Sequence, residues 1–476
     1  MFWWILLLLV AAFVAVILIR TIRFRPAAEE PAPELPAPID AQHAADSLSA
    51  MIRCRTVSYY DKSKIDEGEF DRFRALLDER YPLVAENCEK KRIETGVLYH
   101  LKGEKADAPC VFMAHFDVVP VNEELWERPP FDAIVEDGVM WGRGTLDTKG
   151  TLCATLEAIE TLLGEGFNPK NDMYFAFAGD EEVNGVTAPA MVSYFESQGI
   201  RPGLVVDEGG AVVENVFPGV TAPCAVVGIA EKGMLSAEFR LNGAGGHASA
   251  PPIHTAIGRL SRVVCNVENH PFKRHLSEPI AKMFDTLGRQ SSFLYRMIFA
   301  NLWCFLPLLD SICKKSGGEL NAMLRTTCAF TQAFGSQATN VLPPEASVGA
   351  NLRLNSCDTP ESALSYLKSL VDDPDIEVAE LYSMNPSPVS RTDGESWEHL
   401  CRAIRATWPE ALVSPYLMLA CSDSRHYGRI SDCVYRFSAM ALSKQERGYI
   451  HGNNERVALE TLTRAAAFYY RLMKQC

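Results

Sequence analysis

The chain has 476 residues, of which 47% are hydrophobic and 22% are charged, the balance of a folded globular protein. This length exceeds that of one ordinary compact domain, so we expect two. The formal net charge of -14, without a long run of lysine and arginine, argues against nucleic acid as a partner, because phosphate binding needs clustered basic side chains.

The first element expected along the chain is a membrane-spanning helix over residues 1–19. This stretch has no charge and no proline, and as a helix it would be roughly 28 Å long, close to the bilayer core. A cleaved signal peptide is the alternative, but it would carry positive charge before its apolar core. Arg20, Arg23 and Arg25 instead follow the apolar run. The positive-inside bias therefore predicts a single-pass anchor with the body facing the cytoplasm.

Residues 20–40 are rich in proline, alanine and glutamate and are expected to be an extended tether. A larger domain is then expected in two parts, residues 41–231 and 358–476. In the first part, strand-like runs at 110–114, 173–178 and 204–206 alternate with helical patterns such as 152–163. This alternation predicts an α/β fold with a mostly parallel sheet covered by helices.

From residue 232 the pattern changes, and residues 232–357 are expected to form a smaller inserted α+β domain. Its expected elements are strands at 236–241, 326–334 and 346–354 and a helix at 255–267. The parent sheet is expected to resume near Ile376 and to close with a helix over 458–473.

Five segments carry candidate metal ligands and acid–base groups. Each is a weak signal alone, but three follow strand-like runs at one end of one sheet, where binding residues gather. Burying these carboxylates beside two histidines would be costly unless a divalent metal is bound. Histidine with aspartate and glutamate, without cysteine, suits catalytic zinc. The segments are His115-Phe116-Asp117, Gly142-Arg143-Gly144 with Asp147, Gly179-Asp180-Glu181-Glu182, Asp207-Glu208-Gly209-Gly210 and His451-Gly452-Asn453-Asn454-Glu455.

These segments belong to a set of motifs that resembles the aminoacylase/carboxypeptidase family of dizinc exopeptidases. Within that family the chain is most similar to the carboxypeptidase S and N-fatty-acyl-amino-acid synthase/hydrolase branch, from about residue 45 to the C-terminus. The motifs, in order, are MAHFDVVP, WGRGTLDTKG, FAGDEEVNG, VVDEGG, GGHASAPP, LRTTCAFT, TNVLPPEA and HGNNE. The resemblance implies a zinc-exopeptidase fold whose insert is a lid and dimerisation domain.

The resemblance also implies two zinc ions, or other divalent metals such as Co²⁺ or Mn²⁺. Asp147 would bridge both ions. His115 and Asp207 would complete one metal site, and Glu182 and His451 the other.

Further roles follow from the same resemblance. Asp117 would orient the His115 ring, and Glu181 would be the general base acting on a metal-bridging water. His247 would stabilise the oxyanion in the active site of the partner subunit of a homodimer. Asn340 and Arg353 would hold the substrate near its carboxylate, although a plain salt bridge is the alternative for Arg353.

The activity implied is hydrolysis of N-acyl amino acids, or of small peptides with a free C-terminal carboxylate. Two alternatives remain open: the same site run in reverse as a synthase, and an inactive metal-binding scaffold tethered to the membrane. The presence of Glu181 counts against the scaffold. The apolar stretch 293–309 fits a branch that handles fatty-acyl substrates, or is a buried helix of the lid.

Overall fold

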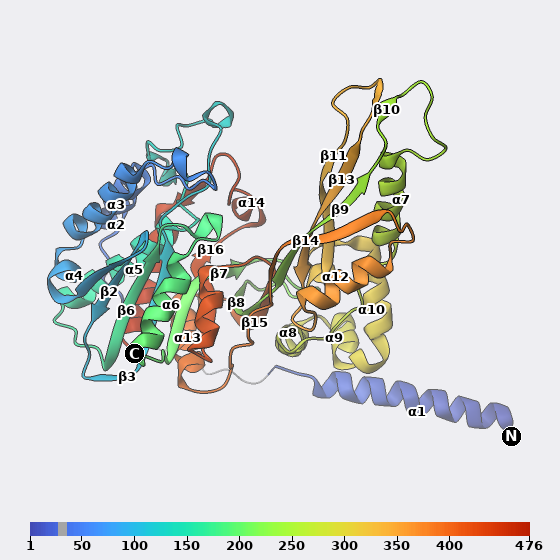
Figure 1. Cartoon of the computed structure of the whole chain (residues 1–476). Helices are drawn as coiled ribbons and strands as arrows, with labels where there is room; N and C mark the ends of the chain where they lie inside the picture. Colours follow the sequence, from blue (N-terminus) through green and yellow to red (C-terminus); the bar gives the residue numbers. More distant parts are fainter. Residues whose placement is uncertain (27–35) are drawn as a thin grey trace.

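The computed structural model describes residues 1–26 and 36–476, and its largest element is an eight-stranded sheet (Figure 1). The strand order is β1-β2-β6-β3-β7-β16-β8-β15. Neighbours are parallel from β6 through β3 and β7 to β16, and again between β8 and β15. The predicted α/β fold is confirmed. The strands are β1 Glu89–Ile93, β2 Gly96–Leu101, β3 Lys105–His115, β6 Asn171–Ala178, β7 Leu204–Val213, β8 Cys224–Glu231, β15 Leu412–Met418 and β16 Val434–Ala441.

Helices cover both faces of this sheet. On one face α5 is buried along most of its length because it lies between the sheet and two further helices, α2 and α15. The opposite face is covered by α6 and the 3₁₀ helix η4. The helices of this domain are α2 Ala41–Ile52, α3 Glu67–Arg80, α4 Pro82–Asn87, α5 Lys149–Gly164, α6 Thr187–Ser197, α13 Glu395–Thr407, α14 Lys444–Arg447 and α15 Leu459–Met473, with η4 at Asp423–Arg429.

The second domain is built on a four-stranded antiparallel sheet of order β11-β13-β9-β14. Burial alternates along β9, so one face packs on α7 and α12 around a separate core. At the end of this domain farthest from the large sheet, β10 pairs with β12 (Figure 1). The elements are β9 Gly233–Asn242, β10 Gly246–His247, β11 Thr327–Phe334, β12 Val341–Leu342, β13 Glu345–Leu354, β14 Ile376–Met384, α7 Ala256–Asn269 and α12 Pro360–Ser369.

The expectation that the parent sheet resumes near Ile376 is wrong. β14, which begins at Ile376, pairs with β9 in the smaller sheet, and the chain rejoins the large sheet only at β15. Residues 358–384 therefore belong with the insert and not with the second part of the catalytic domain.

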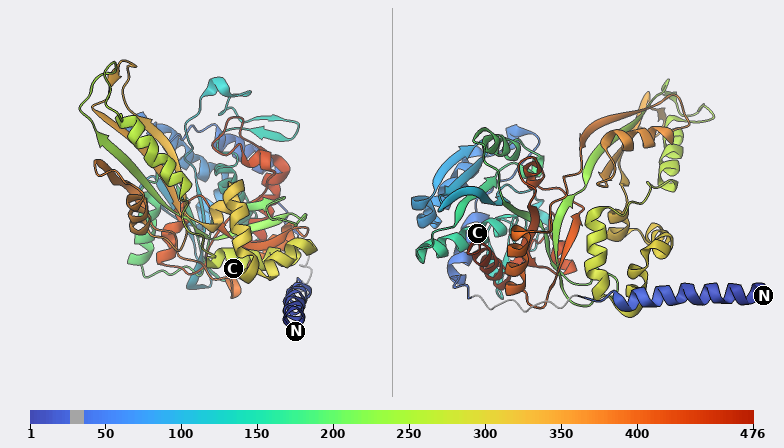
Figure 2. Two further views of the ribbon diagram at one scale, coloured as in Figure 1. Left: turned by 90° about the vertical axis from the view of Figure 1, so that its right-hand side faces the viewer. Right: turned by 90° about the horizontal axis from the view of Figure 1, so that it is seen from below.

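The N-terminal helix α1, Phe2–Arg23, extends past the expected 1–19 to include Arg20 and Arg23. It is long and apolar enough to cross a membrane, and most of its length projects free of the body (Figure 2). Its last turns contact α9 of the insert. Of the tether predicted over residues 20–40, residues 20–23 instead belong to α1, and residues 27–35 lie outside the described residues. The neighbouring helices are α8 Glu278–Gln290, α9 Phe293–Ala300, α10 Leu302–Ser316 and α11 Gly318–Leu324.

A small three-stranded sheet of order β17-β5-β4 joins two distant parts of the catalytic domain. β17, Arg456–Ala458, follows the last motif of the sequence, whereas β4, Ile134–Glu136, and β5, Val139–Trp141, precede the second motif. This pairing brings the segment after His451 against the segment before Asp147.

Candidate active site

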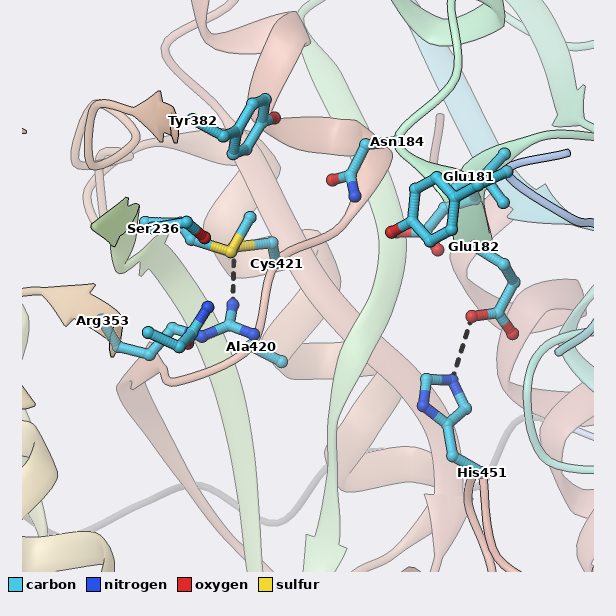
Figure 3. A pocket seen from close by; sticks show the side chains of 13 residues that line it. Glu181, Glu182, Asn184, Ser236, Arg353, Tyr382, Ala420, Cys421 and His451 are labelled. Carbon is cyan, nitrogen blue, oxygen red and sulfur yellow. Dashed lines mark hydrogen bonds and ion pairs between the residues drawn. The ribbon is translucent and has the colours of Figure 1, made fainter. Parts of the chain in front are cut away.

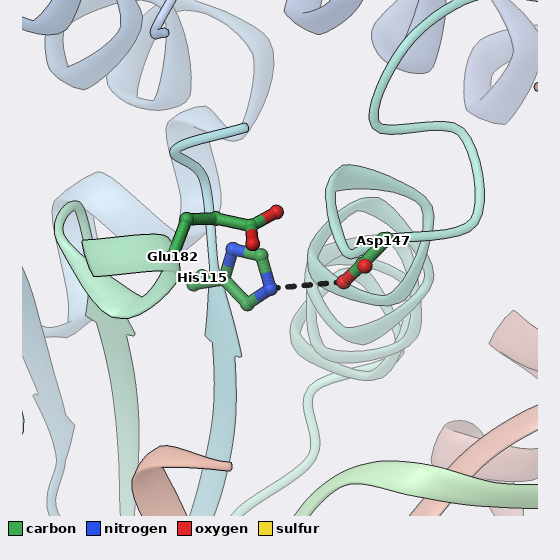
Figure 4. A group of neighbouring side chains, drawn as sticks. All are labelled: His115, Asp147 and Glu182. Carbon is green, nitrogen blue, oxygen red and sulfur yellow. Dashed lines mark hydrogen bonds and ion pairs between the residues drawn. The ribbon is translucent and has the colours of Figure 1, made fainter. Parts of the chain in front are cut away.

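The end of β3 and the loop that precedes α5 place a histidine against a carboxylate. His115 is the last residue of β3 and is 2% exposed, and its Nε2 lies 3.1 Å from Oδ1 of Asp147. Glu182, from the 3₁₀ turn after β6, joins them (Figure 4). One ligand atom from each of the three lies within 4.8 Å of the others, a spacing suited to a shared metal ion.

His451 approaches the same carboxylates from the far end of the chain. Its Nε2 is 3.0 Å from Oδ2 of Asp147. The same atom is 3.0 Å from Oε2 of Glu182 (Figure 3). Asp147 therefore lies between His115 and His451, with one oxygen directed at each ring. A carboxylate in this position can serve two metal ions at once.

Asp117 is fully buried and fixes the backbone of the two glutamates. Its carboxylate accepts hydrogen bonds from the amides of Glu181 and Glu182, both at 3.1 Å, and from the hydroxyl of Ser58 at 2.7 Å. His115 Nδ1 lies 2.9 Å from the Asp117 carbonyl and 3.5 Å from its carboxylate. Asp117 thus contacts the His115 ring and also sets the position of the turn that carries both glutamates.

Glu208 is a member of the cluster that lies in one of the five candidate segments but was given no role from the sequence. Its Oε1 lies 3.8 Å from His115 Nε2, and it forms a second close group with His115 and Glu181. The expected ligand Asp207 is also buried, and its carboxylate accepts a hydrogen bond from the Ser424 amide at 2.9 Å. Among the described residues, two groups of side chains are close enough to share a metal ion, and Asp207 belongs to neither of them.

Burial and mutual repulsion make this cluster unfavourable for negative charge. Burial raises the pKa of Glu181 well above its usual range, and nearby Asp423 raises it further. Burial likewise raises the pKa of Glu208, with Asp147 adding to the shift. Within the described residues, Oε1 of Glu182 and Oδ2 of Asp423 are buried without a hydrogen-bond partner. Bound divalent cations would balance these charges, so the residues present fit a two-metal centre.

The loop that carries Asp147 is fixed by Glu455, at the end of the last motif. The Glu455 carboxylate accepts hydrogen bonds from the amides of Gly144, Leu146 and Asp147 at 2.7–3.2 Å. Its other partner is the guanidinium of Arg143 at 2.6 Å, and both charged side chains are buried. Glu455 therefore connects the His451 segment to the Asp147 loop.

A cavity of about 690 Å³ opens beside the cluster, lined by Glu181, Glu182 and His451 on one side and by Arg353 on the other (Figure 3). Arg353 comes from β13 of the insert, and its Nη1 donates to the sulfur of Cys421 at 3.3 Å. No ion pair to Arg353 is found among the described residues, which argues against the salt-bridge alternative. A cation facing this cavity can bind an anionic group of a substrate.

The other two residues expected from the insert lie elsewhere in this chain. His247 is on β10 and Asn340 is just before β12, both exposed at the tip of the insert, where the Ala248 amide donates to the Asn340 carbonyl at 2.9 Å. Neither residue lines the cavity that contains Glu181. The structure thus groups His247 with Asn340 and separates both from Arg353.

The sequence model of Peptidase family M20/M25/M40 matches residues 111–475, the greater part of the chain. The chain belongs to this family. Two similar relatives are a probable carboxypeptidase S-like protein of Dictyostelium discoideum and an N-fatty-acyl-amino acid synthase/hydrolase of Xenopus tropicalis. Each is 33% identical to this M20 chain over 90% of its length, covering 84% and 85% of the relative.

Solved M20 structures share the fold. The M20 family metallo-carboxypeptidase Sso-CP2 of Sulfolobus solfataricus matches with a TM-score of 0.69 at 17% identity, over 90% of this chain and 98% of that one. A dinuclear metal binding M20 peptidase of Bacillus subtilis matches with a TM-score of 0.55 at 11% identity, over 91% of this chain and 98% of that one. The chain is therefore an enzyme of the M20 metallopeptidase type, and the predicted family resemblance is confirmed.

Proposed function

We propose that this M20 enzyme hydrolyses the amide bond of N-acyl amino acids, or of small peptides, that end in a free carboxylate. The observation that carries the proposal is the position of Arg353, whose guanidinium faces the same cavity as Glu181 and His451. A planar guanidinium binds both oxygens of a carboxylate. The adjacent amide of such a substrate would then lie beside the acidic cluster.

The residues divide the chemistry between them. His115, Asp147, Glu182 and His451, with Asp207 or Glu208, would hold two divalent metals, for which zinc suits the donor set. Such ions polarise a carbonyl and lower the pKa of water. Glu181 takes the proton of the attacking water and delivers it to the leaving amine, a role that suits a carboxylate lining the cavity beside Glu182 and His451.

The test compares N-acyl amino acids with the same compounds as methyl esters or amides of the carboxylate. We expect the enzyme to cleave only the free acids and a metal chelator to abolish turnover. Arg353→Gln should raise KM for the free acids with a smaller change in kcat, because it removes binding of a group remote from the reacting amide. Arg128→Gln is the control, since Arg128 pairs with Glu136 on the surface. Equal cleavage of blocked and free substrates would refute the proposal.

Synthesis of N-fatty-acyl amino acids, the reverse of hydrolysis, is a second candidate activity. It is favoured by the similarity to relatives named N-fatty-acyl-amino acid synthase/hydrolase. One site must catalyse both directions of a reversible reaction. Supplying high fatty acid and amino acid to the enzyme, and measuring N-acyl product, distinguishes a working reverse reaction from hydrolysis alone.

We also propose that α1 is retained as a membrane anchor and that the body faces the cytoplasm. Retention is supported by the burial of Ile17 and Thr21, whose partners on the insert would be uncovered if α1 were cleaved. The orientation follows from Arg20, Arg23 and Arg25 at the body end of α1. Protease added to intact cells should leave the body undigested. Digestion of the body by external protease would show that the body faces the outside. A mature N-terminus beyond residue 23 would show that α1 is cleaved and would refute the anchor.

A further inference from the structure

Exposed apolar side chains gather on α9 and α10 of the insert, residues 293–316, here called the α9–α10 hairpin. The two helices together are as apolar as a membrane span but are bent by 112° at Asn301. Soluble proteins rarely leave a large group of apolar side chains exposed to water, so the exposed side chains of the hairpin need a partner that covers them. The exposed residues are Phe293, Leu294, Tyr295, Trp303, Leu308 and Ile312, each between 41% and 62% exposed.

The α9–α10 hairpin is attached to α1 by specific polar contacts. The side chain of Asn301 is fully buried at the bend, and its amide nitrogen lies 3.3 Å from both the Ile17 carbonyl and the Thr21 hydroxyl. Nε of Arg20 donates to the Ala300 carbonyl at 3.1 Å. Since buried polar groups require partners, these contacts fix the hairpin against the helix (Figure 1).

The contact extends well along α1. The rings of Phe13 and Trp303 meet edge to face with centroids 5.8 Å apart. Phe13 precedes Arg23 by ten residues of helix, a rise of roughly 15 Å, about half of a bilayer core of roughly 30 Å. If α1 spans a bilayer, Trp303 therefore lies at membrane depth. Both segments of the hairpin are helical, so most of their backbone groups are paired internally, as lipid requires; the exceptions lie at the break near Asn301 and at Pro307 inside α10, which has no amide hydrogen to donate.

Basic side chains lie where the apolar surface ends. Arg20 and Arg23 occupy the last turn of α1, and Lys314 and Lys315 the last turn of α10. Arg289 of α8 donates to the Arg25 carbonyl at 3.2 Å. Lys314 also pairs with Asp310, and Arg289 with Asp285. The other cations at this edge of the apolar surface suit the anionic phosphates of lipid headgroups.

We propose that the α9–α10 hairpin is a second membrane-contacting element, which inserts its exposed apolar side chains into the lipid beside α1. A lipid surface fits better than a protein partner because the same environment must also cover the free sides of α1, to which the hairpin is joined. The inference rests on the proposed retention of α1. It assigns the insert, and not only the N-terminal helix, to the membrane.

The test uses the full chain in nanodiscs of phosphatidylcholine and phosphatidylserine. A photoreactive benzophenone residue is placed in turn at Trp303, Leu308 and Ile312. Leu9 in α1 serves as the lipid-facing reference. Ile253, 96% exposed beyond β10, serves as an apolar control away from the hairpin. Retained metal content shows that each labelled protein is folded. After illumination, mass spectrometry should find phospholipid adducts at 303, 308 and 312 as at 9, and none at 253.

Three other results would overturn the proposal. Adducts at Leu9 without adducts on the α9–α10 hairpin would leave α1 as an anchor but remove the hairpin from the membrane. Cross-links from position 303 to a second copy of the chain in place of lipid would assign the surface to contact between copies. Absence of adducts at Leu9 as well would refute the anchor and the hairpin together, leaving the proposed hydrolase activity untouched.

Discussion

Asp207 and Glu208 are neighbours on β7, yet their carboxylates have different partners. In a regular strand adjacent side chains point to opposite faces. Here the pairing with β16 is irregular: Asp207 is opposite Arg436 and Gly210 is opposite Phe437, so Glu208 and Gly209 are extra residues in β7. Such a bulge redirects side chains. It explains how Glu208 reaches His115 although a regular strand gives no reason to expect it.

In the proposed two-metal centre, these two carboxylates are alternatives for one ligand position. We expect Glu208→Gln to lose about one metal ion per chain, because an amide oxygen is a much weaker zinc ligand than a carboxylate. Asp207→Asn should keep both ions, because its carboxylate already accepts from the Ser424 amide. Elemental analysis after dialysis measures the difference. Loss of metal from Asp207→Asn alone would return the ligand role to Asp207.

How well the sequence predicts the place of a single site residue depends on whether the residue follows a recognisable strand or lies on a loop. His115 and the pair Glu181–Glu182 follow strands, so periodicity alone places them at one sheet edge. Asp147 and His451 lie on loops; both stood in the five candidate segments, but only the motif resemblance gave them roles as metal ligands. The role of Asp117 in holding two backbone amides was not predicted, because such contacts depend on the path of a turn and not on residue type.

At the scale of elements, the segments that meet around Glu455 come from opposite ends of the catalytic domain. Its carboxylate pairs with Arg143 inside the protein and accepts three amides of the Asp147 loop. We expect Glu455→Gln to lower the free energy of unfolding by about 3–5 kcal/mol, since the substitution leaves a buried guanidinium without its counter-charge. Urea denaturation of the metal-free protein measures this separately from metal loss.

The matched control for that variant is Glu136→Gln. Glu136 pairs with Arg128, but both side chains are well exposed, and exposed pairs contribute little to stability. We expect its unfolding midpoint to equal that of the parent protein. Equal midpoints for Glu455→Gln and the parent would show that the Asp147 loop does not depend on this carboxylate.

Element positions were predicted well from the sequence, but strand partners were not. The expected strand at 236–241 and helix at 255–267 lie within or nearly match β9 and α7. β14 was assigned to the wrong sheet because its alternating pattern describes one half-buried strand equally well in either domain. Which sheet it joins is decided by the path of the chain through α12, which periodicity does not encode.

At the scale of the whole molecule, the insert has two ends with different surroundings. Arg353 lies at the end that faces the acidic cluster of its own chain, whereas His247 and Asn340 lie at the far tip. If His247 acts in catalysis, it must reach a different active site from the one it is covalently joined to. This geometry supports the proposed homodimer, in which each tip would serve the partner's cavity.

Complementation between two inactive variants tests that arrangement. His247→Ala should keep both metals but lose about 2.7–4 kcal/mol of transition-state stabilisation, the size expected for an oxyanion donor. Glu181→Gln should keep both metals and lose turnover because the base is absent. After subunit exchange, a heterodimer contains one site with an intact Glu181 and the partner's intact His247. Activity should return to at most about a quarter of the parent value for random pairing.

The matched control mixes Glu181→Gln with Arg353→Gln. Both residues line the same cavity of one chain, so every heterodimer has one defect in each site. The mixture should therefore have only the activity of its Arg353→Gln subunits, about half that of an equal total amount of Arg353→Gln protein. Recovery with His247→Ala but not with Arg353→Gln assigns His247 to the partner's site and Arg353 to its own. Failure of the His247→Ala mixture despite proven subunit exchange would contradict the shared site, and the tip of the insert would then have no part in catalysis.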